Sequence, residues 1–99
     1  MNYNRPMKFE WDSDKSDTCF KERGFDFAYV LQAFLDPKRI VRKDNRWSYG
    51  EDRYQLLGAI EHRVFVVVYT IRGSAIRIIS ARKANQREVT YYEDYTGDD

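Results

Sequence analysis

Apolar and polar positions recur with regular spacing along most of the chain, and this spacing predicts its first elements. Residues 7–11 alternate apolar and charged side chains, with Phe9 and Trp11 on one face, which predicts a short strand. Asp12 is a typical helix N-cap and Gly24 a typical C-terminal stop. Together they bracket a polar helix.

A second, amphipathic helix is predicted after Asp26, a further N-cap candidate. Pro37 cannot continue a helix and restricts Asp36 before it, so the helix ends there. Between these limits the apolar residues follow the i, i+3, i+4, i+7, i+8 spacing of one helix face: Phe27, Val30, Leu31, Phe34 and Leu35.

The second half of the chain predicts an antiparallel sheet. A charged edge strand is expected over residues 38–43, and a loop from Asn45 to Gly50. Strand-like runs then follow at 51–60, 64–71 and 75–81. The short connections around His62 and Gly73 favour hairpins, and the middle run is apolar on both faces, so we expect it to be the central strand.

A final helix is predicted behind Asn85, which has capping-box spacing to Glu88. Its aromatic and apolar residues fall on two neighbouring stripes, Val89 with Tyr92 and Tyr91 with Tyr95. The predicted fold is therefore α+β: an N-terminal strand and two helices, an antiparallel β-meander and a C-terminal helix, with one layer of helices over a twisted sheet. The 99 residues form a single domain, with an ordered core expected over 8–93 and frayed termini.

Composition is that of an ordinary globular protein. The chain is 42% hydrophobic and 33% charged, which is too apolar for a disordered protein. Cys19 is the only cysteine, which excludes an intrachain disulfide and a metal cluster built on thiolates. The start of the chain does not resemble a signal peptide, and the longest apolar stretch, 64–71, is too short to cross a bilayer. A cytoplasmic protein without membrane contact is expected.

The 17 basic and 16 acidic residues nearly cancel, but they are unevenly distributed. Residues 72–87 contain basic residues and no acid, whereas residues 88–99 contain acids and no base. A second basic stretch, which includes Arg46, extends over 38–46 and is interrupted only by Asp44. Such clusters hold a phosphate backbone even near zero net charge, or they form a solvated face balanced by acids elsewhere.

Most standard catalytic motifs are absent from the sequence. It has no Gly-rich phosphate loop, no nucleophile elbow and no histidine pair at metal-ligand spacing, so no cofactor or metal is expected. His62 fits a turn residue and Cys19 a buried thiol. If the alternate residues that include Tyr54 and Ile76 face the helices, Arg53 and Arg77 project from the opposite face of the sheet.

Arg82 and Lys83 stand where the sheet ends, close to the partly positive N-terminus of the last helix. Cations on one open face suit a phosphodiester, and RNA is cleaved when its own 2′-hydroxyl attacks the phosphate. Glu51 would then serve as a general base if its environment raises its pKa, and Trp11 would stack an unpaired base. In the alternative interpretation Trp11 belongs to the core, Glu51 pairs with an arginine, and the arginines solvate the sheet.

The closing run Arg77-Ile78-Ile79-Ser80-Ala81-Arg82-Lys83-Ala84, followed by Asn85-x-x-Glu88 and Tyr92-Glu93, resembles the C-terminal signature of the BrnT toxins. Further pieces occur in the order of that family: Phe9-Glu10-Trp11-Asp12, Gly24 with Phe27, Asp36-Pro37, Gly50-Glu51-x-Arg53-Tyr54 and Val66-Val67-Val68-Tyr69-Thr70. The resemblance extends over residues 8–93, nearly the whole chain.

The resemblance implies the toxin of a type II toxin–antitoxin pair, with a fold similar to the RelE ribonucleases, which cleaves RNA and arrests growth. It also implies a BrnA-like antitoxin with a ribbon-helix-helix region, a 2:2 heterotetramer, and operator DNA bound only through the antitoxin. On this basis Trp11 and Arg53 are the first candidates for activity, and Arg77, Arg82 and Lys83 come second.

The chain departs from the family pattern just before Gly24. The family usually has Asn-x-x-Lys-His-Gly there, whereas this chain has Cys19-Phe20-Lys21-Glu22-Arg23. Either Lys21 and Arg23 compensate as RNA-binding residues, or the activity is weak. Two functions therefore follow: a metal-independent endoribonuclease, or a toxin-like subunit that has lost cleavage and acts as a binding module and co-repressor with its antitoxin.

Overall fold

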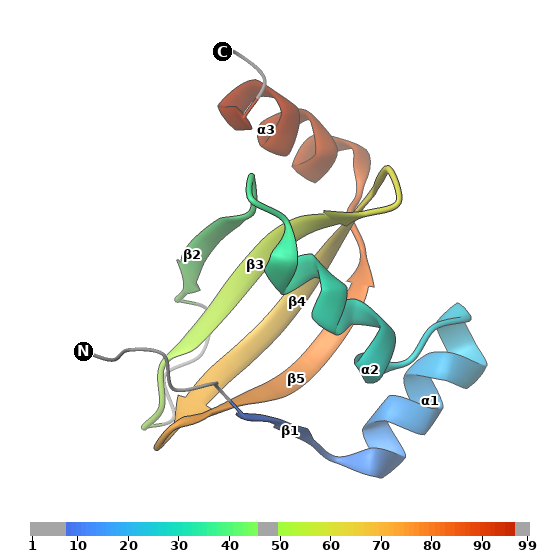
Figure 1. Ribbon diagram of the computed structural model, residues 1–99, viewed down its shortest axis with the longest axis vertical. Helices are drawn as coiled ribbons and strands as arrows, with labels where there is room; N and C mark the ends of the chain where they lie inside the picture. The colour runs from blue at the N-terminus through green and yellow to red at the C-terminus, as the bar shows by residue number, and fades with distance from the viewer. Residues whose placement is uncertain (1–7, 46–49, 97–99) are drawn as a thin grey trace.

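The chain forms a five-stranded sheet with helices on both faces, in a computed structural model that describes residues 8–45 and 50–96 (Figure 1). Residue 7 of the first predicted strand, Arg46 and most of the predicted loop, and the tail beyond residue 96 lie outside the described residues. In chain order the elements are β1 (Lys8–Trp11), α1 (Ser13–Arg23), α2 (Phe27–Val30), the 3₁₀ helix η1 (Leu31–Leu35), β2 (Ile40–Asp44), β3 (Arg53–Ile60), β4 (Arg63–Arg72), β5 (Ala75–Lys83) and α3 (Gln86–Thr96). No helix in the described part is long and apolar enough to span a bilayer.

The strand order β1-β5-β4-β3-β2 places β4 in the middle, as its apolar sequence predicts. β2 to β5 form an antiparallel meander, and β1 joins its edge parallel to β5. The β3–β4 hairpin closes through Glu61 and His62, both with positive φ (50° and 72°), and Gly73 (φ 60°) turns the next hairpin. Both predicted hairpins are confirmed, and His62 is a turn residue.

The predicted helix caps are also confirmed. Asp12 accepts hydrogen bonds from the first backbone N–H groups of α1, and Gly24 ends this helix in the left-handed conformation, with φ 90°. Asp26 caps α2, and the buried Ser16 hydroxyl of α1 accepts the N–H of Phe27 at 3.0 Å. This bond fixes the start of α2 against α1.

The second predicted helix differs from expectation in its second half. It is α-helical only to Val30 and continues as the 3₁₀ helix η1. A 3₁₀ helix has three residues per turn, so a stripe spaced for an α-helix rotates away from the core. Leu35, predicted to face the core, is accordingly 79% exposed, whereas Val30 and Ala33 are fully buried.

The main core lies between these helices and one face of the sheet, which we call the helix face. Alternate residues of β3, β4 and β5 supply it, and aromatic rings connect its parts. η1 approaches β3 closely at Gly58, where an added Cβ would lie 2.5 Å from the backbone oxygen of Ala33. Only glycine fits that contact.

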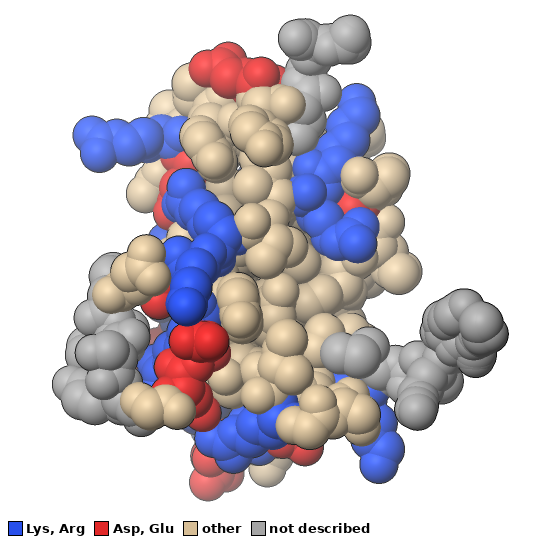
Figure 2. Space-filling model, turned by 90° about the vertical axis from the view of Figure 1, so that its left-hand side faces the viewer, with Lys and Arg blue, Asp and Glu red and all other residues tan. Residues whose placement is uncertain are grey.

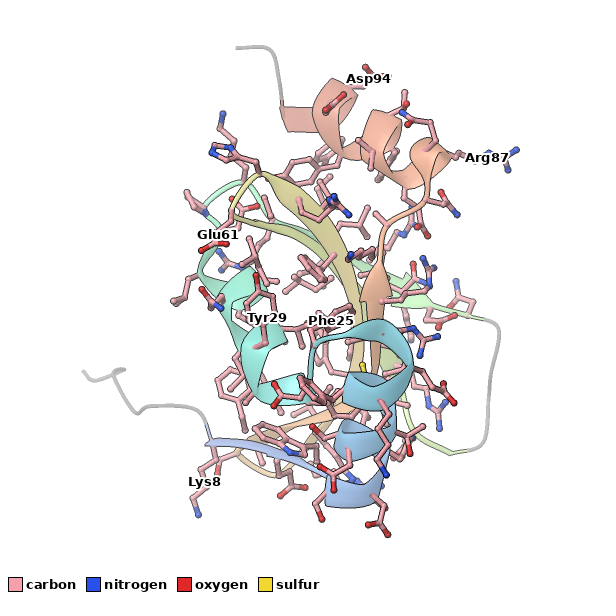
Figure 3. The ribbon with its side chains drawn as sticks, turned by 90° about the vertical axis from the view of Figure 1, so that its right-hand side faces the viewer. Lys8, Phe25, Tyr29, Glu61, Arg87 and Asp94 are labelled. Atoms are coloured by element: carbon pink, nitrogen blue, oxygen red, sulfur yellow. The ribbon has the colours of Figure 1, made fainter. Side chains whose placement is uncertain are left out.

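α3 lies on the opposite face of the sheet, so the single helix layer expected from the sequence is wrong. Val89 and Tyr92 of α3 pack on a second apolar cluster formed by Ile40, Leu57, Val64 and Val66. In Figure 3, α2 lies to the left of the strands and α3 begins to their right. The reason is that β4 is apolar on both faces, so a second helix is needed to cover part of its other side.

Polar contacts hold α3 in place. The predicted capping box is confirmed, because Asn85 and Glu88 exchange reciprocal hydrogen bonds of 2.9 Å. The Tyr92 hydroxyl donates a short hydrogen bond to the Asp36 carboxylate, which also accepts the N–H of Ala59 at 2.7 Å. Asp36 therefore joins the end of η1, β3 and α3.

We expect Tyr92→Phe to lower the free energy of unfolding by about 1–2 kcal/mol, because it removes a hydrogen bond to a charged group.

Burial raises the pKa of the Asp36 carboxyl, but hydrogen bonds from Tyr92, Ala59 and Lys38 outweigh burial and leave this pKa below its ordinary value. A lowered folded-state pKa stabilises the protein above the unfolded pKa, and this contribution is lost as the pH falls through the folded value. Urea unfolding across the acid range should thus show a shallower acid decline in Asp36→Asn. If the stability of Asp36→Asn fell as steeply with acid as that of the wild type, the Asp36 carboxylate would not be the group that links stability to pH.

Candidate functional site

The sheet face opposite the helix face carries a line of mostly charged residues on the part of the sheet that α3 does not cover. The strand registers place Asp44 beside Arg53 and Arg77 between Thr70 and Glu10. Since Tyr54 pairs with Tyr69, Arg53 opposes Thr70. The resulting line across all strands, Asp44–Arg53–Thr70–Arg77–Glu10, is called the arginine row. Its two arginines stand two strand spacings apart, or about 10 Å between backbones.

Each arginine of the row is held by a carboxylate. Arg53 lies 3.7 Å from Glu51, and Arg77 lies 3.4 Å from Glu10. The other oxygen of Glu51 contacts Arg72 at 3.5 Å. The side chains of Arg53 and Arg77 keep 27% and 29% of their surface exposed, so both guanidinium groups are positioned and remain accessible. The predicted placement of Arg53 and Arg77 on one face is confirmed, and Glu51 joins them.

A second row lies between the arginine row and α3. Arg42, Gln55, Val68 and Ser80 are register partners on successive strands. Arg42 donates to the Gln55 side chain at 3.0 Å, and its guanidinium lies 5.1 Å from the ring centre of Tyr91 on α3. Sequence reasoning did not single out Glu10, Asp44, Gln55 or Ser80. Alternation predicts the sheet face on which each side chain lies. Only the pairing register shows which residues from distant parts of the chain become neighbours on that face.

Trp11 is not part of this surface. It lies on the helix face beside Ile78, is half-buried, and packs against the main core. The sheet thus separates Trp11 from Arg53 and Arg77, which were predicted to share one site. This placement fits the core interpretation of Trp11.

The cations near the sheet end divide between the two faces. Arg82 makes a bidentate ion pair with Glu88 of α3, with two distances of 2.8 Å. The pKa of Glu88 is lowered, chiefly by Arg82. Lys83 pairs in register with Phe65 and lies on the helix face. Arg82 and Lys83 are therefore close in the chain but point to opposite sides.

Lys83 and Arg23 meet at a concavity at the end of α1. It measures about 450 Å³ and is lined by Phe20, Arg23, Gly24, Phe25, Asp26, Tyr29, Phe65 and Lys83. We call it the aromatic groove. Figure 3 shows Phe25 and Tyr29 next to one another beside α2. Lys21 is exposed on the same helix but does not line the groove.

Acidic and basic groups are interleaved on the side of the molecule where β2 forms the edge. Figure 2 shows Lys and Arg side chains beside Asp and Glu side chains there, and the pair Lys43–Asp52, at 3.3 Å, belongs to this region. On this side, the interpretation of a solvated face whose basic residues are balanced by acids fits better than that of a basic surface for a phosphate backbone.

Cys19 was predicted to be a buried thiol, and no metal site was expected from the sequence. Cys19 is 3% exposed and its pKa is raised, chiefly by burial. Within 8–45 and 50–96, no three side chains of His, Cys, Asp or Glu gather where they could hold a metal ion. The described site is thus composed of arginines, carboxylates and neutral polar groups.

A comparison with protein families places this arrangement in context. Residues 11–88 match the family of the ribonuclease toxin, BrnT, of type II toxin–antitoxin systems. The match extends from the end of β1 into the first turn of α3 and includes Arg53, Arg77 and Arg82. A comparison with curated proteins finds no match.

Proposed function

The chain belongs to the BrnT family of ribonuclease toxins of type II toxin–antitoxin systems, and on this premise we propose that it is an endoribonuclease whose working surface is the arginine row. The observation that carries the proposal is the placement of Arg53 and Arg77 on either side of Thr70. Two guanidinium groups in this arrangement suit one phosphodiester, whose oxygens they bind as planar forks.

The proposed reaction uses the RNA 2′-hydroxyl as the nucleophile. Its oxygen forms a bond to phosphorus, its proton passes to Glu51, and the bond from phosphorus to the 5′-oxygen breaks. The leaving oxygen takes a proton from water, so the products carry a 2′,3′-cyclic phosphate and a 5′-hydroxyl. Arg53 and Arg77 stabilise the additional negative charge on the phosphate oxygens. No metal takes part in this scheme.

RNA beyond the scissile phosphate is proposed to contact Arg82, Lys83, Lys21 and Arg23, which border the sheet end and the end of α1. The family implies an antitoxin partner. We propose that this partner is BrnA-like, with a ribbon-helix-helix region, and that two copies of each chain form a cytoplasmic heterotetramer that binds operator DNA through the antitoxin.

The second candidate function is a toxin-like subunit that has lost cleavage and serves as a binding module and co-repressor. The departure at Cys19–Arg23 favours it, because this segment ends α1 at the border of the aromatic groove. In this case the arginine row would remain a set of structural ion pairs.

Growth after induction separates the two functions. The endoribonuclease arrests growth when produced alone, and co-production with its antitoxin relieves the arrest. RNA incubated with the purified protein in EDTA should acquire 2′,3′-cyclic phosphate ends. Normal growth despite good yield of folded protein, with intact RNA, would contradict the endoribonuclease and favour the binding module.

A further inference from the structure

The aromatic groove presents one ring that the fold does not use. Phe25 and Phe65 are 7% and 3% exposed and contact each other edge to face, with ring centres 5.0 Å apart. The ring centre of Tyr29 lies 5.9 Å from that of Phe65, so the three rings pack together. Phe20, on the last turns of α1, is 58% exposed and makes no ring contact in the described structure. Phe20 therefore presents an unpacked aromatic face at the border of a groove whose other lining includes Phe25, Tyr29 and Phe65.

Two cations border the same groove. Within the described residues Lys83 has no carboxylate partner, and the one carboxylate that pairs with Arg23 is that of Glu22, at 4.0 Å and with both side chains exposed. Arg23 also contacts the Cys19 thiol. Exposed pairs of this kind are weak, so both cations are available to an anion. Asp26 also lines the groove, but its carboxylate accepts the N–H of Tyr29 at 2.9 Å and thereby caps α2. The groove thus combines an open aromatic ring with positive charge.

From these observations we propose that the aromatic groove is a nucleotide subsite, in which an unpaired base of single-stranded RNA stacks on Phe20 and its phosphate lies between Arg23 and Lys83. This inference rests on the proposed function, because it takes RNA as the substrate. A nucleotide carries a flat aromatic face and an anion in one unit, which is what the groove requires. An acidic peptide without aromatic side chains would satisfy the cations and leave the Phe20 ring without a stacking partner.

The subsite lies on the helix face of the sheet, whereas the arginine row lies on the opposite face, so a bound RNA would pass around the end of β5. Arg77 and Lys83 are six residues apart on β5, or roughly 20 Å along the strand. A concavity lined by Arg23, Phe25, Arg82 and Lys83 lies at this end of β5, between the groove and the α3 side. The bound base therefore belongs to a nucleotide several positions from the cleaved bond. It contributes to the choice and affinity of the RNA and leaves the chemical step unchanged.

Binding of a labelled, 2′-O-methylated single-stranded RNA, followed by fluorescence anisotropy, tests the subsite without cleavage. We expect Phe20→Ala to raise the Kd about tenfold and Phe20→Tyr to restore most of the affinity. Lys83→Gln should reduce the slope of log K against log salt by about 0.7, the loss of one phosphate contact to a single strand, whereas Phe20→Ala should leave this slope unchanged. A duplex of the same sequence should bind more weakly than the single strand.

Leu35→Ala is the matched control, since Leu35 is also a large exposed apolar residue but lies on η1 outside the groove. It should bind RNA as the wild type does. With cleavable RNA, Phe20→Ala should raise KM and leave kcat unchanged. An unchanged Kd for Phe20→Ala overturns the subsite, as does a loss of antitoxin binding without a loss of RNA binding. Failure of the arginine row in cleavage would not alter these binding results, so the two proposals fail separately.

Discussion

Replacement of Arg53 by alanine is expected to lower the rate of RNA cleavage by a factor of about 10²–10³ and to abolish growth arrest. A charge-stabilising donor at a reacting phosphate contributes on this order to catalysis. The fold should survive, because Arg53 lies at the start of β3, is partly exposed, and loses one ion pair of a kind that contributes little. Arg53→Lys should recover only part of the activity, since lysine lacks the planar fork.

Arg72→Ala is a matched control for Arg53→Ala. Arg72 contacts the same carboxylate, Glu51, at 3.5 Å, but lies at the hairpin end of β4. Arg72→Ala should cleave RNA at a rate within about twofold of the wild type. Arg72→Ala and Arg53→Ala should have similar thermal unfolding curves. Undiminished cleavage by a folded Arg53→Ala protein would remove the arginine row from the active site.

Arg77→Ala provides an independent check on the proposed clamp. If Arg53 and Arg77 bind one phosphate together, each single variant loses most of the activity. The double variant should then lose much less than the product of the two single losses, as residues that act as a unit do. Strictly multiplicative losses would show that the two arginines act on different groups.

Gly58→Ala is expected to have the largest effect on stability, a loss of about 2–3 kcal/mol. The added Cβ would meet the Ala33 backbone oxygen at 2.5 Å and the Leu56 side chain at 3.1 Å. The backbone oxygen belongs to η1 and cannot move without displacing that helix from the sheet, so the variant combines overpacking with loss of core contacts. Urea unfolding should show a lower midpoint, and an unchanged midpoint would contradict the close approach of η1.

Gly24 offers a contrasting control. A Cβ there meets nothing within 4 Å, but φ is 90°, so Gly24→Ala costs about 1 kcal/mol through backbone strain alone. Asparagine tolerates this conformation, and Gly24→Asn should recover part of the loss. Gly58→Asn should be no more stable than Gly58→Ala, because any Cβ at this position collides with the Ala33 backbone oxygen.

Local sequence determined most of the elements of this protein. Asp12, Gly24 and Asp26 form the caps expected from their types, and Asn85 with Glu88 forms the expected capping box. These signals work because each depends on hydrogen bonds within a few residues. The alternation of Arg53 with Tyr54 likewise determines that the two side chains lie on opposite faces of the sheet.

The spacing of apolar residues was less informative where two helix types compete. The stripe from Phe27 to Leu35 fits an α-helix, but the chain tightens to a 3₁₀ helix after Val30. Packing of Ala33 against Gly58 accompanies this change, and neither residue signals it in the sequence. The exposure of Leu35 is the consequence.

What the sequence determined by itself is the identity of the elements, the side of each strand on which a residue lies, and, through its motifs, the family. Only the tertiary structure decided that Arg53, Arg77 and Glu10 share one row, that Trp11 lies on the other face, and that α3 covers the face opposite α2. The physical reason is the distance along the chain over which the deciding contacts act. Caps and alternation arise from contacts between near neighbours, whereas register and helix placement depend on which distant apolar surfaces pack together.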